Sequence, residues 1–377
     1  MKKGIMIMLF SLIPLFGLTS YLHASTFVPA DDPKIQYYGR WDMTDPKHPK
    51  HSWPGVYLIV KFTGTSIGIR TDDTANYYNV YIDGKFMNVF HGTQPGEKDY
   101  ILAVNLKKGN HILRLSKRNF AFNTPYNTFS GFILDDKGKL LTPPPRPGKR
   151  IEFIGDSFTA AEGNEVTQPG MKWEDKFPLT NMDKGFAGLI GQHYQSDYRT
   201  ICRSGSGLVC DWQANYELTI PKRWDRTLME SADPKWNFKS WQPDLVVLCL
   251  GLNDSSGMKG KVGNSTLRDG KISDEKSIEF RNGYKNFLAT LRVDYPKTKI
   301  LCVAALGDWL KQNINQVVDE EKSAGMKDIY YAQFDWVDGL YIDGHPTIAG
   351  HQNIADQLIK AIDSYNIFLK QEKRRDF

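Results

Sequence analysis

Serine, histidine and aspartate can together form a nucleophilic site, and this sequence holds each of them in a short, turn-like motif. Ser157 ends the run Gly-Asp-Ser at residues 155–157, directly after a strand-like apolar stretch. His345 and Asp343 occur together in Asp-Gly-His-Pro at residues 343–346. An imidazole can take the proton of a serine hydroxyl, and a carboxylate can hold the tautomer of that imidazole. These side chains therefore predict acyl transfer through a serine nucleophile.

Two further motifs offer groups that could stabilise the negative charge of a tetrahedral intermediate. The run Ser-Gly-Ser-Gly at residues 204–207 lets the backbone approach a ligand closely, because glycine has no side chain. Asn253, within Gly-Leu-Asn-Asp at residues 251–254, supplies a neutral amide that can donate to an oxyanion. Each motif alone is common by chance. Their shared placement after predicted strands is what makes them a candidate site.

The elements that would carry these motifs are predicted by near-continuous apolar runs that alternate with helical patterns. The strand candidates are residues 151–154, 199–202, 245–250, 300–303 and 329–331. Helices are expected between them, with a last one from about residue 347 to residue 369. This alternation predicts a parallel sheet with helices on both faces, a three-layer α/β domain. Ligands bind at the carboxyl ends of such strands, where the motifs lie.

A different pattern precedes a proline-rich linker at residues 143–149. Prolines fix the backbone and remove amide donors, so this segment can continue neither a helix nor an inner strand. Before it, the apolar runs are short and are separated by turn residues such as Asp-Gly at 83–84, which are typical of tight hairpins. We therefore predict an all-β sandwich of the jelly-roll kind over residues 25–142, followed by the α/β domain over residues 150–377.

The N-terminal segment, residues 1–24, is predicted to be a secretory signal peptide. Two lysines precede an uncharged run over residues 5–18, and Leu-His-Ala at 22–24 offers a cleavage site. A membrane anchor is the alternative, but the run is short for a bilayer and contains Pro14. We expect a secreted or periplasmic protein with no stable membrane insertion after cleavage.

Composition narrows the class of protein further. Hydrophobic residues make up 41% and charged residues 24% of the 377 residues, which are ordinary globular values. A formal charge of +5 is too small to argue for a nucleic-acid partner. Of the four cysteines, Cys202 and Cys210 could form a disulfide in an exported protein. Cys249 and Cys302 lie inside strand patterns and are expected as buried free thiols.

The four motifs, in their order along the chain, resemble those of the SGNH, or GDSL, hydrolases. The resemblance implies that Ser157 is the nucleophile and His345 its base, with Asp343 orienting the imidazole. It further implies an oxyanion hole made by the backbone amides of Ser157 and Gly207 and the side chain of Asn253. Because a jelly-roll-like domain precedes the hydrolase domain, the chain is similar to carbohydrate esterase family 2.

That similarity implies a serine esterase that removes O-acetyl groups from a hemicellulose such as xylan or glucomannan, with no metal or cofactor. Acetylated oligo- or polysaccharide would be its partner; the oligomeric state is not predicted. Two features depart from the general SGNH pattern. Cys202 stands where many members have asparagine, and the last motif is Asp-x-His rather than Asp-x-x-His. The second departure is itself like family 2, some of whose members orient the histidine through a backbone carbonyl, so either Asp343 or such a carbonyl could do so here.

Other readings of these residues stay open at this stage. A lipolytic or aryl esterase of the same superfamily would need a broad apolar acyl pocket, and a carbohydrate-binding protein with a vestigial site would not hydrolyse esters. Asp343, His345 and His351 could form a metal site, although His351 falls inside the last helical pattern. Trp309 and Trp212 lie in predicted loops, where flat aromatic faces could contact sugar rings or pack into the core.

Overall fold

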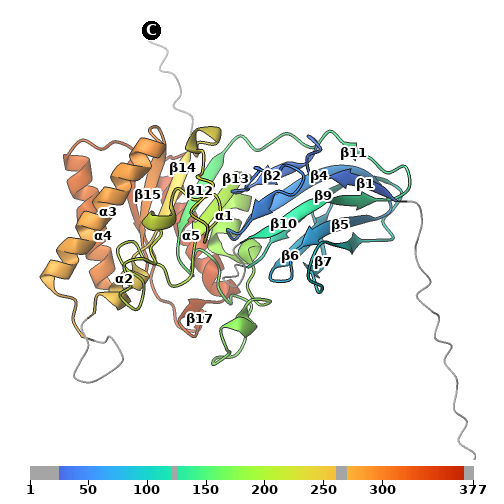
Figure 1. The fold of residues 1–377 in the computed structure, drawn as a ribbon. Helices are drawn as coiled ribbons and strands as arrows, with labels where there is room; N and C mark the ends of the chain where they lie inside the picture. The colour runs from blue at the N-terminus through green and yellow to red at the C-terminus, as the bar shows by residue number, and fades with distance from the viewer. Residues whose placement is uncertain (1–24, 120–125, 260–269, 369–377) are drawn as a thin grey trace, which may run out of the picture.

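The computed structural model describes residues 25–119, 126–259 and 270–368. The predicted signal peptide, residues 1–24, lies outside these residues. Figure 1 shows two parts side by side, with strands alone in the N-terminal part and strands covered by helices in the C-terminal part. In the described part of the chain, every helix is too short or too polar to cross a membrane.

The N-terminal part is a sandwich of two antiparallel sheets. One sheet has the order β1-β10-β5-β8, with β3 beside β10, and the other has the order β11-β4-β9-β6-β7, with β2 beside β4. The strands of the first are β1 (Thr26–Pro29), β3 (Lys50–His51), β5 (Ile67–Asp72), β8 (Lys98–Ala103) and β10 (Asn127–Leu134). Those of the second are β2 (Gln36–Tyr38), β4 (Tyr57–Gly64), β6 (Tyr77–Ile82), β7 (Lys85–His91), β9 (Gly109–Lys117) and β11 (Leu140–Leu141).

The strands of the sandwich follow the alternation expected of a sheet with one face in the core. In β4, Leu58, Val60 and Phe62 are buried while the residues between them are partly exposed. Asp83 and Gly84 join β6 to β7 in a two-residue turn, and both have positive φ, as the sequence predicted.

The C-terminal part contains a parallel sheet in the order β13-β12-β14-β15-β16. Its strands are β12 (Arg150–Gly155), β13 (Asp197–Cys202), β14 (Leu245–Cys249), β15 (Lys299–Ala304) and β16 (Ile329–Gln333). They overlap the predicted strands one for one. The predicted fold class, an all-β sandwich followed by a three-layer α/β domain, is therefore confirmed.

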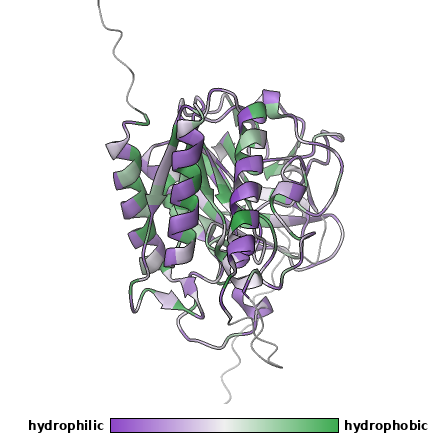
Figure 2. Ribbon diagram, turned by 90° about the vertical axis from the view of Figure 1, so that its left-hand side faces the viewer, coloured by the Kyte–Doolittle hydropathy of each residue, from purple (hydrophilic) through white to green (hydrophobic). Residues whose placement is uncertain are grey.

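Helices cover this sheet and short turns of 3₁₀ helix lie in the loops. The α-helices are α1 (Phe186–His193), α2 (Leu252–Gly257), α3 (Asp274–Asp294), α4 (Asp308–Ser323) and α5 (Ile348–Ser364). The 3₁₀ turns are η1 (Glu174–Lys176), η2 (Met182–Lys184), η3 (Pro221–Arg223) and η4 (Phe238–Ser240). A short hairpin pairs β17 (Tyr341–Ile342) with β18 (His345–Pro346). Helix α1 packs with α5, and α3 with α4. Figure 2 shows hydrophobic strands enclosed by helices whose outward faces are hydrophilic.

The strand order creates a switch point beside β12. The chain passes from β12 to β13 on one side and then crosses to β14 on the other. The loops that leave β12, β13 and β14 therefore diverge from a common crevice, which is where open α/β sheets bind ligands.

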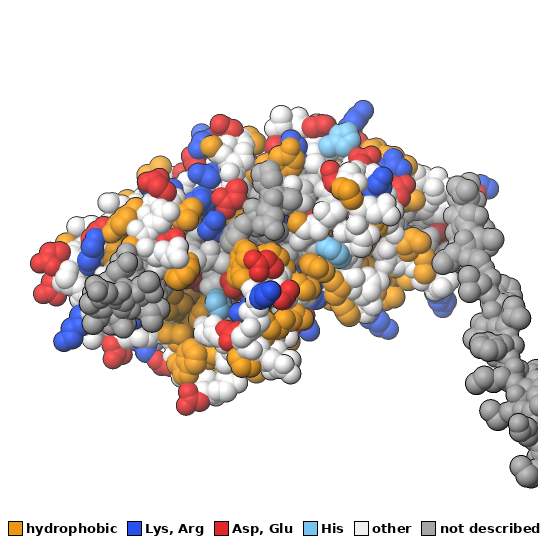
Figure 3. Space-filling model, turned by 60° about the horizontal axis from the view of Figure 1, so that its bottom comes forward, with side chains coloured by type: hydrophobic (Ala, Val, Ile, Leu, Met, Phe, Trp, Pro, Cys, Tyr) orange, Lys and Arg blue, Asp and Glu red, His pale blue; other side chains and the backbone are white. Residues whose placement is uncertain are grey.

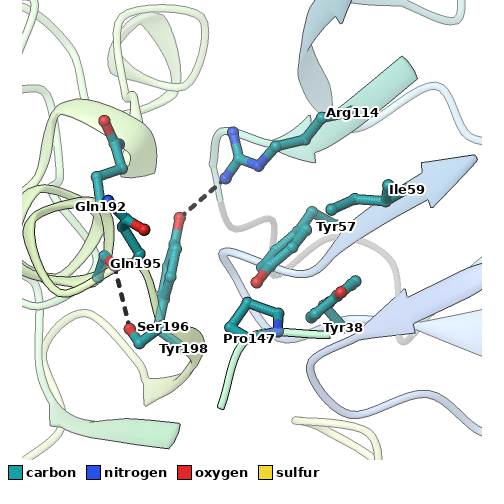
Figure 4. Close-up of a pocket in the computed structure, with 10 residues that line it drawn as sticks. Tyr38, Tyr57, Ile59, Arg114, Pro147, Gln192, Gln195, Ser196 and Tyr198 are labelled. Atoms are coloured by element: carbon teal, nitrogen blue, oxygen red, sulfur yellow. Dashed lines mark hydrogen bonds between the residues drawn. The ribbon is translucent and has the colours of Figure 1, made fainter. Parts of the chain in front are cut away.

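The two parts share a buried interface. Arg40 reaches from the sandwich into the α/β domain, where its guanidinium donates to the carbonyls of Trp224 and Arg226 and lies 4.9 Å from the Trp224 ring. One of its nitrogens lies 3.7 Å from the Glu152 carboxylate inside β12. Figure 4 shows a second contact, in which Arg114 from the sandwich meets Tyr198 of the α/β domain across a small crevice.

A cluster of polar side chains around Asp183 forms hydrogen bonds across the same interface. Its carboxylate accepts hydrogen bonds from Arg114 at 2.7 Å, Asn79 at 2.8 Å and Ser116 at 2.9 Å, all of which come from the sandwich. Burial opposes the ionisation of Asp183, but Arg114 and these hydrogen bonds outweigh it and lower its pKa to about 2. We call these four residues the Asp183 cluster.

Candidate active site

Ser157 lies in a tight turn directly after β12. The turn leaves room for no side chain at Gly155, where a Cβ atom would lie 1.9 Å from Thr159 Oγ1 and 2.9 Å from the Cys249 carbonyl. Asp156 holds the turn, because its carboxylate accepts a hydrogen bond of 3.0 Å from the Phe158 amide. Ser157 is thereby presented at the switch point of the sheet.

The neighbouring strands end at the same level. In the parallel register, Gly155 pairs with Cys202 of β13 and with Cys249 of β14. The Ser-Gly-Ser-Gly loop at 204–207 and the start of α2 consequently flank the turn that carries Ser157. Three motifs that are widely separated in sequence meet here because of strand register alone.

Gly207 is required by close packing. A Cβ atom there would lie 1.9 Å from the Cys210 carbonyl and 2.5 Å from a carboxylate oxygen of Asp254. Among the described residues, the backbone N–H group of Ser157 donates to no protein acceptor. Gly207 forms a parallel β-bridge with Thr219, in which its carbonyl accepts from the Ile220 amide at 3.0 Å. An unengaged amide at the serine itself is one of the donors that an oxyanion hole requires.

Asn253 lies in the first turn of α2 and joins the ends of the three strands. Its amide nitrogen donates to the Asp156 carboxylate at 3.2 Å and to the Ser206 carbonyl at 3.0 Å. Burial, opposed by the hydrogen bond from the Phe158 amide and helped by the nearby Asp254 carboxylate, raises the pKa of Asp156 to about 7. The side chain predicted to hold an oxyanion therefore lies directly beside a carboxyl group that titrates near neutral pH.

Asp254 has a structural part in the site. Its carboxylate accepts hydrogen bonds from the amides of Leu208, Val209 and Cys210 at 2.8, 2.6 and 3.0 Å. These bonds fix the loop that follows Gly207. Burial nevertheless raises the pKa of Asp254 to about 6.

His345 lies in β18, next to the serine turn. Its ring centroid is 5.8 Å from that of Phe158, the residue that follows Ser157. His345 Nδ1 lies 3.2 Å from the backbone carbonyl oxygen of Asp343. Because a carbonyl oxygen only accepts, Nδ1 carries the proton and Nε2 is left as the basic nitrogen.

The carboxylate of Asp343 is directed elsewhere. Both of its oxygens accept from the amide of Gly170, at 3.1 and 3.0 Å, and Lys176 Nζ lies 3.3 Å from one of them. The Gly170 amide, helped by Lys176, lowers the pKa of Asp343. Of the two alternatives left open by the sequence, this geometry favours the backbone carbonyl as the group that orients His345.

Glu162 is a residue that the sequence analysis did not single out. Its carboxylate lies 3.8 Å from His345 Nε2, and its side chain is only 7% exposed. The chain turns it inward through Ala161, which has a φ of +55°. The one signal in the sequence was its place five residues after Ser157, which does not by itself indicate contact with a residue at position 345.

The two predicted sugar-contacting tryptophans occupy different places. Trp212 is 54% exposed and its ring lies against Gly205, on the loop that flanks Ser157. Trp309 packs against Phe280 with ring centroids 4.9 Å apart and donates its indole N–H to Ser277 at 2.8 Å. Trp309 therefore joins α3 to α4, and of the two only Trp212 is brought to the candidate site.

The metal-site and disulfide alternatives find no support in the described residues. No group of three or more His, Cys, Asp or Glu side chains there could hold a metal ion. His351 is buried and accepts a hydrogen bond from the Phe186 amide at the start of α1. Burial, helped by the nearby His345, lowers the pKa of His351 to about 3. The cysteines at 202, 210, 249 and 302 are all buried free thiols.

Comparison with known families gives one match in the sandwich and one in the α/β part of the chain. Residues 37–144 match the N-terminal domain of carbohydrate esterase 2, and residues 236–362 match the GDSL-like lipase/acylhydrolase family. The cellulase/esterase CelE of Acetivibrio thermocellus is 30% identical over 88% of this chain, which spans only 39% of that relative. An acetylxylan esterase/glucomannan deacetylase of Cellvibrio japonicus is 28% identical over 82% of this chain and 84% of its own length.

Solved structures give the same grouping. A family two carbohydrate esterase from Clostridium thermocellum, in complex with cellohexaose, has a TM-score of 0.76 and 28% identity, covering 88% of this chain and 99% of the other. The acetyl xylan esterase Est2A of Butyrivibrio proteoclasticus shares the fold, with a TM-score of 0.79 at 21% identity over 91% of this chain and 100% of its own. With its sandwich, its GDSL-like domain and these relatives, the chain belongs to carbohydrate esterase family 2, a family of carboxylic ester hydrolases.

Proposed function

We propose that this chain is a serine esterase that removes O-acetyl groups from carbohydrate through an acyl-enzyme. The observation that carries the proposal is the meeting, at one switch point, of Ser157 with its unengaged backbone amide and a histidine whose Nε2 is the basic nitrogen. The names of the family relatives, among them acetylxylan esterase/glucomannan deacetylase, support the acetyl group and the carbohydrate.

The first step is the attack of Ser157 Oγ on the ester carbonyl carbon. His345 Nε2 takes the hydroxyl proton, while Nδ1–H stays bonded to the Asp343 carbonyl, 3.2 Å away. The imidazole becomes positively charged as this proton moves. The Glu162 carboxylate, 3.8 Å from Nε2, is suited to stabilise that charge in a largely buried position.

The oxyanion that forms would be held by the amides of Ser157 and Gly207 and by Asn253. Both amide hydrogens of Asn253 are engaged, so it would exchange its longer bond, 3.2 Å to Asp156, for one to the oxyanion. Losing one such donor typically costs about 3 kcal/mol of transition-state stabilisation. The alcohol leaves with the proton from His345, and water then cleaves the acyl-enzyme by the same sequence of steps. Every step uses groups of this chain.

We propose xylan or glucomannan as the polysaccharide. Trp212, exposed beside the loop that carries Gly207, offers a flat apolar face to a sugar ring next to the reacting ester. We also propose that the protein is exported, on the strength of the lysines and the apolar run within residues 1–24.

Acetate release by the wild type and by Ser157→Ala tests the central claim. The substrates are acetylated xylan, acetylated glucomannan and p-nitrophenyl acetate, with release from p-nitrophenyl esters of longer acids as a comparison. We expect release by the wild type only, with a preference for acetyl. Equal release by both proteins refutes the serine mechanism, a preference for long acyl chains indicates a lipolytic esterase, and no release at all indicates a vestigial site.

A further inference from the structure

A groove of about 860 Å³ lies outside the catalytic turn, between the β6–β7 hairpin of the sandwich and the segment of the α/β domain that spans residues 165–184. We call it the hairpin groove. Its volume is within the range of small-molecule sites in proteins. In Figure 1 the hairpin, the η1 turn and β17 all lie along the lower side of the molecule.

One wall of the groove is aromatic, although it belongs to the outward face of a sheet. Three cross-strand pairs line it: Tyr77 with His91, Asn79 with Val89, and Tyr81 with Phe86. The rings of the first pair are stacked at 4.1 Å, and those of the last meet edge to face at 5.8 Å. Phe86 is 54% exposed and Val89 is 41% exposed. The outward face of a sandwich is usually polar, so this apolar wall needs a partner.

The floor of the groove is polar, and its groups are held in place by one another. Arg118 donates to the Asn79 side-chain carbonyl at 2.8 Å and also pairs with Glu165. Glu165 accepts from Asn181 at 2.9 Å and from Lys184 at 2.8 Å. The cations and the carboxylate are thus paired at close range. A highly charged polymer of either sign would meet a group of its own sign there.

The groove is joined to the catalytic turn through the chain that forms its far wall. Asn164 binds both the amide and the carbonyl of Asn181, at 2.9 and 3.0 Å. Its own carbonyl accepts from Ile348, the first residue of α5, which follows the motif of His345. Glu162, which contacts His345, and Glu165, which lies on the groove floor, are three residues apart. Figure 3 looks onto this side of the molecule and shows hydrophobic side chains spread over both domains.

We propose that the hairpin groove binds a neutral segment of the polysaccharide beyond the acetylated residue at Ser157. A pyranose ring has an apolar face of C–H groups and a rim of hydroxyls. The C–H face can pack on the aromatic wall, and the hydroxyls can form hydrogen bonds with the amides, the guanidinium and the carboxylate of the floor. The proposal rests on polysaccharide deacetylation as the function, and it gives the sandwich a direct part in substrate selection.

The experiment compares Phe86→Ala with Phe27→Ala in the full chain. Phe27 is 42% exposed on β1 of the other sheet and serves as the matched aromatic control. Binding of unsubstituted xylohexaose and mannohexaose is measured by calorimetry, and kcat/KM is measured on acetylated polysaccharide and on p-nitrophenyl acetate. We expect Phe86→Ala to weaken binding and to lower the ratio of the two kcat/KM values by about fivefold, which corresponds to about 1 kcal/mol for a lost aromatic contact. Phe27→Ala should change neither.

Val89→Arg, which places a long charged side chain over the middle of the wall, gives a second test should Phe86→Ala fold poorly. Unchanged binding and an unchanged ratio in folded Phe86→Ala and Val89→Arg overturn the proposal, as does an equal loss in Phe27→Ala. The calorimetric result stands apart from the esterase mechanism. If Ser157→Ala kept full activity, the proposed function would fail. Oligosaccharide binding by Phe86→Ala and Val89→Arg would still test whether the hairpin groove binds polysaccharide.

Discussion

Two buried carboxylates of this protein have opposite surroundings. Asp183, at the interface of the two domains, accepts from an arginine, an asparagine and a serine, and its pKa falls to about 2. Asp156, at the catalytic edge, accepts from one backbone amide and from the long bond of Asn253, and burial raises its pKa to about 7. Both side chains are nearly inaccessible to solvent. The number and charge of the donors, rather than depth, sets the difference.

The comparison distinguishes residues that stabilise the domain interface from residues that serve catalysis. The Asp183 cluster at the interface is held by charge-assisted hydrogen bonds, which stabilise the contact between the two domains. The catalytic edge holds groups that are incompletely bonded, such as the backbone amide of Ser157, which donates to no acceptor among the described residues. Incomplete bonding costs folding free energy, and it leaves those groups available to a transition state. Substitutions in the two regions should therefore separate activity from stability.

The largest effect on activity is expected for His345→Ala. Removing the base should lower kcat/KM on p-nitrophenyl acetate by about 10⁴-fold or more, because serine alone is a weak nucleophile. Stability should change little, since the imidazole is partly exposed and its one protein hydrogen bond is to a carbonyl. Initial rates and urea unfolding of the same preparation check both halves. Activity within tenfold of wild type would contradict the assignment of His345.

The largest effect on stability is expected for Asp183→Ala. It leaves Arg114 at the interface without its carboxylate, which should lower the free energy of unfolding by about 3 kcal/mol or more. The control is Asp99→Ala, which breaks an exposed pair with Arg70 and should cost ~1 kcal/mol or less. Urea midpoints of the two variants give the comparison. Equal midpoints would mean that the interface contributes no more than a surface ion pair.

The two carboxylates also predict opposite dependences of stability on pH. The pKa of Asp183 is lowered on folding, so its stabilisation of about 2 kcal/mol is present at neutral pH and is lost as the pH falls from about 4 towards 2. The pKa of Asp156 is raised, so the unfolded chain ionises first and stability declines as the pH rises from about 4 to 7. Urea midpoints from pH 2 to pH 8 check this. Asp183→Asn should flatten the acidic limb alone, and Asp156→Asn the neutral limb alone.

The smallest effects distinguish the two acids near His345. Glu162→Gln removes the charge 3.8 Å from Nε2 and should lower kcat/KM by about tenfold. Asp343→Asn alters a carboxylate bonded to Gly170 and Lys176 and should lower it by about threefold or less. A larger loss of kcat/KM on p-nitrophenyl acetate for Asp343→Asn than for Glu162→Gln would instead indicate that the Asp343 side chain assists His345.

Much of this arrangement could be predicted from the sequence. The strands of the parallel sheet are buried on both faces, so each appears as an apolar run that needs no knowledge of its partners. Ser157, Gly207 and Asn253 follow such runs, and parallel pairing brings strand ends together. The hairpin turn at 83–84 could be predicted from its own two residues, because Asp and Gly are among the few that tolerate the positive φ of such a turn.

What could not be predicted depends on contacts between distant parts of the chain. The orientation of the Asp343 carboxylate follows from the positive φ of Asp343 and from a bond to Gly170, which is 173 residues away. The approach of Glu162 to His345 likewise joins two loops. Trp309 was a candidate for contact with sugar rings, with packing into the core as the alternative, and α4, which begins at Asp308, turns its ring onto α3. No local pattern reports such helix packing.

The burial of Arg40 between the two domains affects whether either domain can be separated from the other or replaced. Its guanidinium lies among Trp53 of its own domain and Trp224, Trp236 and Phe238 of the other, and none of its side chain reaches solvent. A hydrolase domain expressed alone would expose that aromatic cage, and a foreign sandwich would have to supply a cation at the same place. We therefore expect the two domains to be exchanged between proteins as a pair rather than singly, because separating them would leave both sides of the Arg40 contact exposed.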